Sequence, residues 1–217
     1  MKTQKNFFNG CKWEQNLTGV IKEYLVKEEE EMFKLVSSKS SSAMTVLDIG
    51  CGEGRMTGKI QPLCSNITGI DLSTEKLETY NKNFNSSGIR GILCNAKSTP
   101  FKDNHFDYAL CGFQTLGNMG EEKYDVLNEI KRVVKPSGKM IFSVYSENAL
   151  EAQLGLYEKC GLGISKIGED YIYTSEGLFS ERFTKEKIIS TFKKVGLTAK
   201  ISVLTPIAYL VEVKNKK

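Results

Sequence analysis

The carboxylate of Asp48 and three glycines stand together in residues 46–54, which read VLDIGCGEG. The apolar residues predict a strand, and Gly50, Gly52 and Gly54 predict a turn that opens a helix. Glycine takes positive φ angles at little cost and lets backbone N–H groups approach a bound molecule closely. The segment therefore predicts a binding loop for a nucleotide-like ligand, with Asp48 at its start.

The spacing of these glycines differs from that of a dinucleotide site. A dinucleotide fingerprint, Gly-x-Gly-x-x-Gly, would need its third glycine at position 55, where this chain has Arg55. Asp48 would also repel a pyrophosphate, because both groups are anions. The loop therefore favours a cationic ligand. The alternative is that Asp48 is structural and only orders the turn.

A second carboxylate, Asp71, ends the next predicted strand, 17 residues after Gly54. In Rossmann-type sites an acid about 20 residues beyond the glycines accepts hydrogen bonds from the ribose hydroxyls. The alternative role is an N-cap, because a predicted helix begins at Ser73. The two roles are compatible with each other.

Alternating strand and helix signals surround these residues. Strands are predicted at 45–49, 67–70, 89–93, 106–110 and 139–144, and helices at 54–63, 73–85 and 121–134. This alternation predicts a doubly wound parallel sheet with helices on both faces.

The end of the chain has a different pattern. Thr184 is a predicted N-cap of a helix that runs to about Val195. Two β-rich runs follow at 199–205 and 207–213, too close together for a crossover helix. They predict an antiparallel hairpin at the sheet edge. The fold class is therefore α/β, with a seven-stranded, mostly parallel sheet.

An amphipathic helix is predicted ahead of the core, with an acidic run at 28–31 as its solvated face and no role in function. Its apolar stripe comprises Leu17, Val20, Ile21, Tyr24, Leu25, Met32 and Val36. We expect one domain over residues 1–217. Its expected parts are an N-terminal helical segment at 1–42, a ligand-binding core at 43–145, a substrate cap at 146–182, and a C-terminal helix and hairpin at 183–217.

Composition restricts the class of protein. The chain is 40% hydrophobic and 26% charged, with a net charge of +4, which is milder than a dedicated nucleic-acid binder carries. No apolar run reaches the length of a membrane span or a secretory signal. The six cysteines form no Cys-x-x-Cys pair and there is one histidine, so zinc-site spacing is absent. We expect a soluble, cytoplasmic protein with reduced thiols and no bound metal.

Five segments in register resemble the class I S-adenosylmethionine-dependent methyltransferases. They are residues 46–54, 69–73, 92–101, 104–107 and 127–138. The resemblance implies a Rossmann-like fold, S-adenosylmethionine as cofactor and S-adenosylhomocysteine as product. The sulfonium and ammonium of this cofactor would suit Asp48.

The resemblance also implies which residues line the cofactor. The glycine loop would hold the methionine end, the acidic segment the ribose and adenine, the third segment the adenine, and the end of strand 106–110 the reactive methyl group. These residues are Asp48, Gly50, Cys51, Gly52, Gly54, Asp71, Leu72, Asn95, Ala96, Leu110 and Cys111, with Gly112 after them. The family commonly has Asp at the position of Asn95, whose carbonyl can accept the same hydrogen bond.

The sequence gives less information about the acceptor of the methyl group. Methyl transfer from a sulfonium is an in-line substitution that mainly needs alignment, so no catalytic residue is predicted, and His105 reads as a surface turn residue. Residues outside the core motifs would contact the acceptor. The candidates are Trp13, Tyr145, Tyr171, Tyr173 and Arg182, with ordinary packing as the alternative for each.

A small-molecule acceptor is the leading expectation, without membrane association, and the sequence does not indicate an oligomeric state. The alternatives are an RNA (tRNA or rRNA) or protein methyltransferase and a non-catalytic S-adenosylmethionine-binding protein, with aminopropyl transfer ranked after them. Lys214, Lys216 and Lys217 favour RNA. However, residues 110–113 read LCGF rather than an (Asp/Asn)-Pro-Pro-aromatic motif, and no cysteine follows a proline.

Overall fold

The computed structural model describes residues 17, 19–38, 41, 43–84, 86 and 88–216. Its main sheet has seven strands in the order β3-β2-β1-β4-β5-β10-β9. The five strands β1 to β5 are parallel, and β10 is antiparallel to both β5 and β9. Their bounds are β1 Thr45–Ile49, β2 Asn66–Asp71, β3 Ile89–Leu93, β4 Phe106–Cys111, β5 Val134–Tyr145, β9 Ala199–Thr205 and β10 Ala208–Lys214. The predicted fold class is confirmed.

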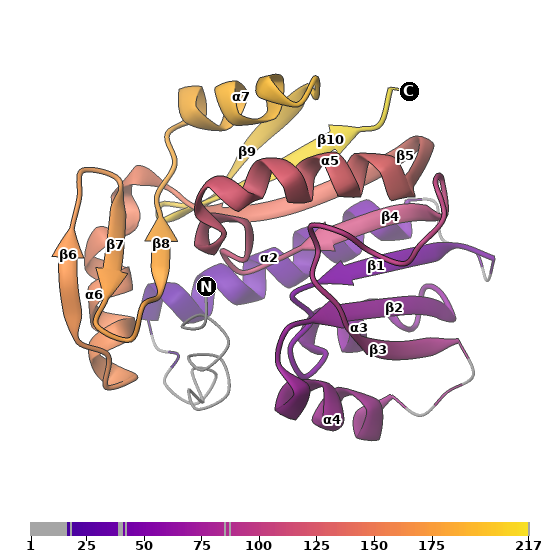
Figure 1. The fold of residues 1–217 in the computed structure, drawn as a ribbon, viewed down its shortest axis with the longest axis horizontal. Coiled ribbons are helices and arrows are strands. Elements are labelled where there is room, and N and C mark those ends of the chain that lie inside the picture. The colour runs from indigo at the N-terminus through magenta and orange to yellow at the C-terminus, as the bar shows by residue number, and fades with distance from the viewer. Residues whose placement is uncertain are drawn as a thin grey trace.

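Helices cover both faces of this sheet (Figure 1). On one face α5 (Lys123–Val133) and α7 (Lys185–Lys194) pack in a core cluster with the apolar side chains of β4, β5 and β10. On the other face α2 (Gly19–Ser37), α3 (Arg55–Ile60) and α4 (Thr74–Asn83) form a second cluster. Thr184 caps α7 as predicted, because its side chain accepts a hydrogen bond from the Lys187 N–H.

The buried stripe of α2 differs from the predicted one at two positions. Val20 is 47% exposed, because it lies off the stripe that Ile21 and Tyr24 define. Glu28 is 0% exposed, so assigning it to a solvated face was wrong. It follows Ile21 by seven residues and Tyr24 by four, and this helical spacing places it on the buried face.

Several predicted boundaries also move. β5 begins at Val134 rather than at residue 139, with Ser137 at a φ of 64° where the strand leaves its register with β4. Helix α3 ends at Ile60, and α5 is preceded by the 3₁₀ turns η2 (Leu116–Asn118) and η3 (Gly120–Glu122).

Residues 146–182, which we call the cap segment, form a small unit beside the carboxyl end of β5 (Figure 1). The 3₁₀ turn η4 (Glu147–Ala149) leads into α6 (Leu150–Lys159). An antiparallel sheet follows, with β6 (Ile164–Ile167), β7 (Tyr171–Thr174) and β8 (Phe179–Glu181). The sequence predicted a cap here but none of these strands.

Among the described residues, no helix has the length and apolar character that crossing a bilayer requires.

Candidate active site

A cavity of about 570 Å³ opens at the carboxyl ends of β1, β2 and β4. This is the edge at which open α/β sheets bind their ligands. The core contributes the loops after the strands, and the cap segment contributes α6 and the turn before β8. The predicted cofactor residues on the cavity wall are Asp48, Gly50, Cys51, Gly52, Gly54, Asp71, Leu72, Asn95, Ala96 and Gly112.

Two of the three glycines in the turn, Gly50 and Gly54, have no room for a side chain. Gly50 has a φ of 68° and Gly54 one of 96°, values that favour glycine. A Cβ on Gly50 would lie 2.7 Å from Cγ2 of Thr115, and one on Gly54 would lie 2.1 Å from the Phe84 ring. The Gly50 N–H donates to the carbonyl of Ile70 at 2.8 Å, which holds the turn against β2. The sequence therefore selects one loop shape.

Asp48 is a buried carboxylate in the cavity wall. It is 3% exposed and accepts a hydrogen bond from Oγ1 of Thr57 at 2.8 Å. Burial raises the pKa of Asp48 to about 6, although the Thr57 hydrogen bond and the Arg55 charge oppose the rise. A cationic ligand in the cavity would favour the ionised form of this group.

Asp71 joins the glycine turn to the start of α4. Its Oδ2 accepts from the Gly52 N–H and its Oδ1 from the Ser73 N–H, both at 2.9 Å. Ser73, not Asp71, is the N-cap of α4. Each carboxylate oxygen retains a second lone pair, so Asp71 can accept from ribose hydroxyls without losing these bonds.

Asn95 is exposed at the rim, and its Oδ1 accepts from the Lys97 N–H at 3.0 Å. Its side chain therefore also orders the loop after β3. Lys97 closes this side of the cavity through an ion pair with Glu122 at 2.8 Å.

Leu110 and Cys111 do not reach the cavity. Both are 0% exposed, and they belong to the core clusters on opposite faces of the sheet. Burial raises the pKa of the Cys111 thiol, so it stays protonated. The wall at the end of β4 is built by Gly112, Phe113, Gln114 and Thr115 instead.

This part of the wall depends on backbone that sequence patterns did not predict. Phe113 and Gln114 have positive φ angles of 39° and 64°. Glu28 on α2 accepts from the Phe113 N–H at 2.6 Å, and the Tyr145 N–H donates to Oε1 of Gln114 at 2.7 Å. These two bonds hold the turn in its unusual conformation.

Glu28 is the centre of a buried polar network that the sequence analysis missed. It also accepts hydrogen bonds from the Ser143 hydroxyl and the Arg55 guanidinium. Arg55 reaches Glu29 at 2.9 Å as well, and it lines the cavity. A buried acid on an otherwise apolar helix stripe was the available signal.

The structure places the candidate acceptor residues in different environments. Tyr145 lines the cavity, whereas Tyr171 and Tyr173 pack against Phe179 in the small sheet. Arg182 is 2% exposed and donates hydrogen bonds to Gln153 and to two backbone carbonyls, so its role is structural. Trp13 lies outside the described residues. His105 is exposed just before β4, at the amino end of that strand, as predicted.

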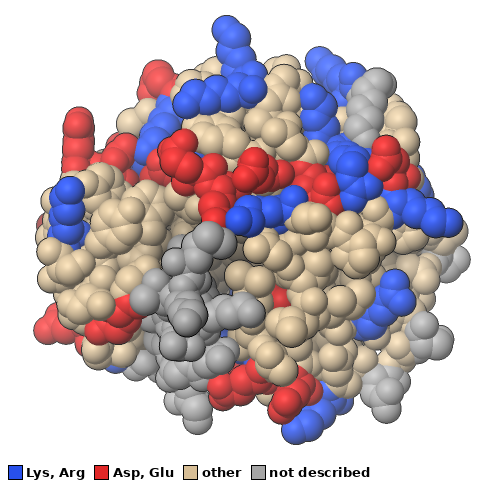
Figure 2. All heavy atoms as spheres, viewed as in Figure 1, with Lys and Arg blue, Asp and Glu red and all other residues tan. Residues whose placement is uncertain are grey.

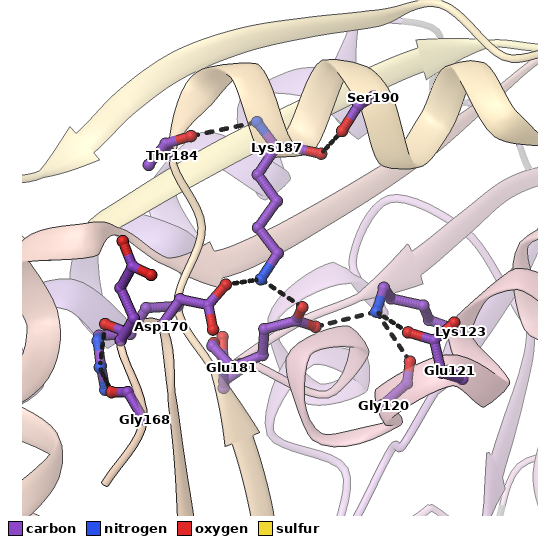
Figure 3. Close-up of polar contacts among 12 residues, drawn as sticks. Gly120, Glu121, Lys123, Gly168, Asp170, Glu181, Thr184, Lys187 and Ser190 are labelled. Carbon is purple, nitrogen blue, oxygen red and sulfur yellow. Dashed lines mark hydrogen bonds and ion pairs between the residues drawn. The ribbon is translucent and has the colours of Figure 1, made fainter.

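The cap segment is attached to the core by ion pairs (Figure 3). Lys123 of α5 and Lys187 of α7 approach Glu181 of β8 at 3.1 and 2.5 Å. Lys187 also pairs with Asp170, which lies between β6 and β7. Glu181 and Lys123 are only 5% and 2% exposed. We call these four residues the charge bridge.

A family model described as a methyltransferase domain matches residues 47–142, the part that contains the glycine turn, Asp71 and the end of β4. The resemblance to the class I S-adenosylmethionine-dependent methyltransferases is therefore confirmed. Among its relatives is the ubiquinone/menaquinone biosynthesis C-methyltransferase UbiE of Shewanella sediminis, 28% identical over 161 residues. That match covers 67% of this chain and 63% of the relative.

Solved structures share the fold at lower identity. An S-adenosylmethionine-dependent methyltransferase from Clostridium acetobutylicum superposes with a TM-score of 0.65 at 17% identity, covering 87% of this chain and 90% of the other. The 1,6-didemethyltoxoflavin-N1-methyltransferase of Burkholderia thailandensis superposes with a TM-score of 0.64 at 14% identity, covering 88% and 79%. The predicted fold is therefore confirmed.

Proposed function

We propose that this methyltransferase-family chain transfers the methyl group of S-adenosylmethionine to a small-molecule acceptor. The observation that carries the proposal is the single cavity wall that joins Asp48, the glycine turn and Asp71 to Leu156, Tyr157 and Leu178 of the cap segment. The cofactor would lie along the carboxyl ends of β1 to β3, with its ribose at Asp71. The acceptor would enter from the cap side.

The chain's own residues would bind and orient rather than exchange protons. Methyl transfer needs the acceptor atom, the methyl carbon and the sulfur in line, in a site that excludes water. Gly112 and Phe113 would border the methyl group, in place of the predicted Leu110 and Cys111. The cap segment would supply the water-excluding wall through Leu156, Tyr157 and Leu178.

Three observations support a small acceptor over RNA. The cap-side wall is apolar. Similar proteins named for a small molecule include the ubiquinone/menaquinone biosynthesis C-methyltransferase, the 1,6-didemethyltoxoflavin-N1-methyltransferase and a geranyl diphosphate C-methyltransferase. On the face drawn in Figure 2, basic and acidic side chains of the described residues alternate in one band instead of forming a basic track. We retain a cytoplasmic location as a prediction.

Calorimetric titration with S-adenosylhomocysteine tests the cofactor. We expect binding to the wild-type chain, no binding of NADH, and at least tenfold weaker binding after Asp71→Ala. Asp103→Ala is the control, because its side chain is 67% exposed and pairs with Arg132 outside the cavity wall. Preference for NADH, or equal affinity in both variants, would refute the proposal.

The acceptor class is tested with methyl-labelled S-adenosylmethionine and a cell extract. We expect label in the solvent-extractable small molecules and none in RNA or protein above a heat-inactivated control. Label in RNA would support the nucleic-acid alternative. Binding of cofactor without any transfer would support a non-catalytic binding protein.

A further inference from the structure

The two ends of the cavity differ in chemistry. The end at the glycine turn contains the charged groups of Asp48, Arg55 and Asp71. The cap end is lined by apolar and aromatic side chains without a formal charge, namely Phe113, Tyr145, Leu156, Tyr157, Cys160 and Leu178. These six residues also belong to, or pack against, one hydrophobic cluster between α2, β5 and the cap segment.

The Tyr145 hydroxyl is the exception at this apolar end. The side chain lines the cavity and is 2% exposed, and its oxygen has no hydrogen-bond partner within the part of the chain that the structure describes. A buried hydroxyl without a partner is costly and rare in folded proteins. Burial raises the pKa of Tyr145 well above its usual value, so the group remains a neutral donor.

The neighbouring polar side chains are already engaged. Tyr157 interacts with Ser180 and Gln153, and its burial raises its pKa to about 12. The Gln114 amide donates to the Glu181 carbonyl and accepts from the Tyr145 N–H at 2.7 Å. Among the described residues at the cap end, the Tyr157 hydroxyl and the Gln114 amide have partners within the protein. The Tyr145 hydroxyl is therefore available to a ligand.

We propose that the cap end binds a neutral aromatic methyl acceptor and that the Tyr145 hydroxyl donates a hydrogen bond to an oxygen atom of that acceptor. The proposal rests on the methyl-transfer function proposed above and names its acceptor class and a specificity-determining residue. An aromatic ring would pack against Phe113 and Tyr157.

The same wall rejects two other classes of molecule. A phosphate or carboxylate would lose its hydration at the cap end without gaining a cation. An aromatic hydrocarbon without the oxygen would leave the Tyr145 donor unpaired, which weakens binding relative to the oxygenated analogue. Tyr145 would therefore select for a neutral, oxygen-bearing ring.

Three probes with one ring system test this selection: 1-naphthol, naphthalene and 1-naphthoate. Their affinities are measured by calorimetry in the presence of saturating S-adenosylhomocysteine. We expect the wild-type chain to bind 1-naphthol most tightly and 1-naphthoate least. Tyr145→Phe should weaken 1-naphthol binding about threefold to tenfold and leave naphthalene binding unchanged. The control Tyr173→Phe, at a side chain 41% exposed and off the cavity wall, should change neither affinity.

The thermal midpoint of Tyr145→Phe gives an independent readout without any probe. Removing an unpaired hydroxyl should leave the midpoint unchanged or raise it. A lower midpoint would show that the hydroxyl has a partner within the protein, and would overturn the proposal. So would unchanged 1-naphthol affinity in Tyr145→Phe, or no 1-naphthol binding by a wild-type chain that binds S-adenosylhomocysteine. Failure of the wild-type chain to bind S-adenosylhomocysteine would instead refute the proposed function.

Discussion

At the scale of single residues, Asp48 shows how the fold sets the charge of the cavity. Its pKa is about 6 in the folded chain, against an ordinary value of 3.8, mainly because the group is buried. The folded state therefore binds an extra proton between these two values. The stability that protonated Asp48 adds to the folded state is fully present below about pH 4 and is lost as the pH rises through about 6. At pH 7 the ionised group costs about 3 kcal/mol of stability.

The first prediction concerns the pH dependence of cofactor binding. A cation near Asp48 favours the carboxylate, so binding should lower its pKa and release a proton. We expect the affinity for S-adenosylmethionine, measured without an acceptor, to rise about tenfold from pH 5 to pH 7. Asp48→Asn should bind more weakly and with a flat profile over this range. A wild-type profile as flat as that of Asp48→Asn would mean that the cofactor's charge does not act on this carboxylate.

At the scale of the elements, Glu28 connects three parts of the fold. It lies on α2, it pairs with Arg55 of α3, and it accepts from the Phe113 N–H just after β4. The network continues through Ser143 on β5, whose hydroxyl lies 2.7 Å from the Tyr24 hydroxyl on α2. Glu28 therefore docks α2 on the sheet and fixes the turn that borders the cavity.

Glu28→Gln tests this role. Removing one partner of a buried ion pair leaves the other charge poorly compensated. We expect the free energy of unfolding in urea to fall by about 2–4 kcal/mol. Glu31→Gln is the matched control on the same helix, because its ion pair with Lys34 is exposed and should be worth less than about 0.5 kcal/mol. Equal losses in the two variants would contradict the role assigned to Glu28.

The elements also show what sequence reasoning could reach. The glycine turn was predictable because its spacing, its strand and its positive φ angles are local properties of residues 46–54. The burial of Glu28 was not, because its partners Arg55 and Ser143 lie 27 and 115 residues away. An acidic run on a helix is normally solvated, and only tertiary contacts override that pattern.

The end of β4 was missed for a different reason. Periodicity identifies a strand but not the residue at which its backbone turns toward the cavity. The second and third residues after the strand, Phe113 and Gln114, have positive φ angles, which neither residue type predicts. The predicted contacts of Leu110 and Cys111 therefore belong to the residues that follow them.

At the scale of the whole molecule, the cavity has one wall from the core and one from the cap segment. β6 is exposed at each of its residues, so the small sheet has few apolar contacts of its own on that edge. Its attachment depends on the third hydrophobic cluster and on the charge bridge. The cap was predicted as a region but its strands were not, because strands of three or four residues are too short to show a clear periodic pattern.

The charge bridge leads to the last prediction. Glu181 compensates two lysines, and Glu181→Gln would leave the buried Lys123 with the Gly120 carbonyl at 3.0 Å as its nearest acceptor. We expect a loss of about 3 kcal/mol in the free energy of unfolding and faster hydrogen exchange in residues 146–182 than in β1 and β4. S-adenosylhomocysteine affinity should change less than about twofold, because Glu181 is not on the cavity wall.

Glu121→Gln is the control for the bridge, because Glu121 lies 3.8 Å from Lys123 but is 90% exposed at its side chain. Its removal should change stability by less than about 0.5 kcal/mol. If exchange accelerated evenly over the whole chain in Glu181→Gln, the cap segment and the core would unfold as one unit. Selective exchange in the cap segment with intact cofactor binding would instead show that the acceptor wall can open while the cofactor wall stays formed.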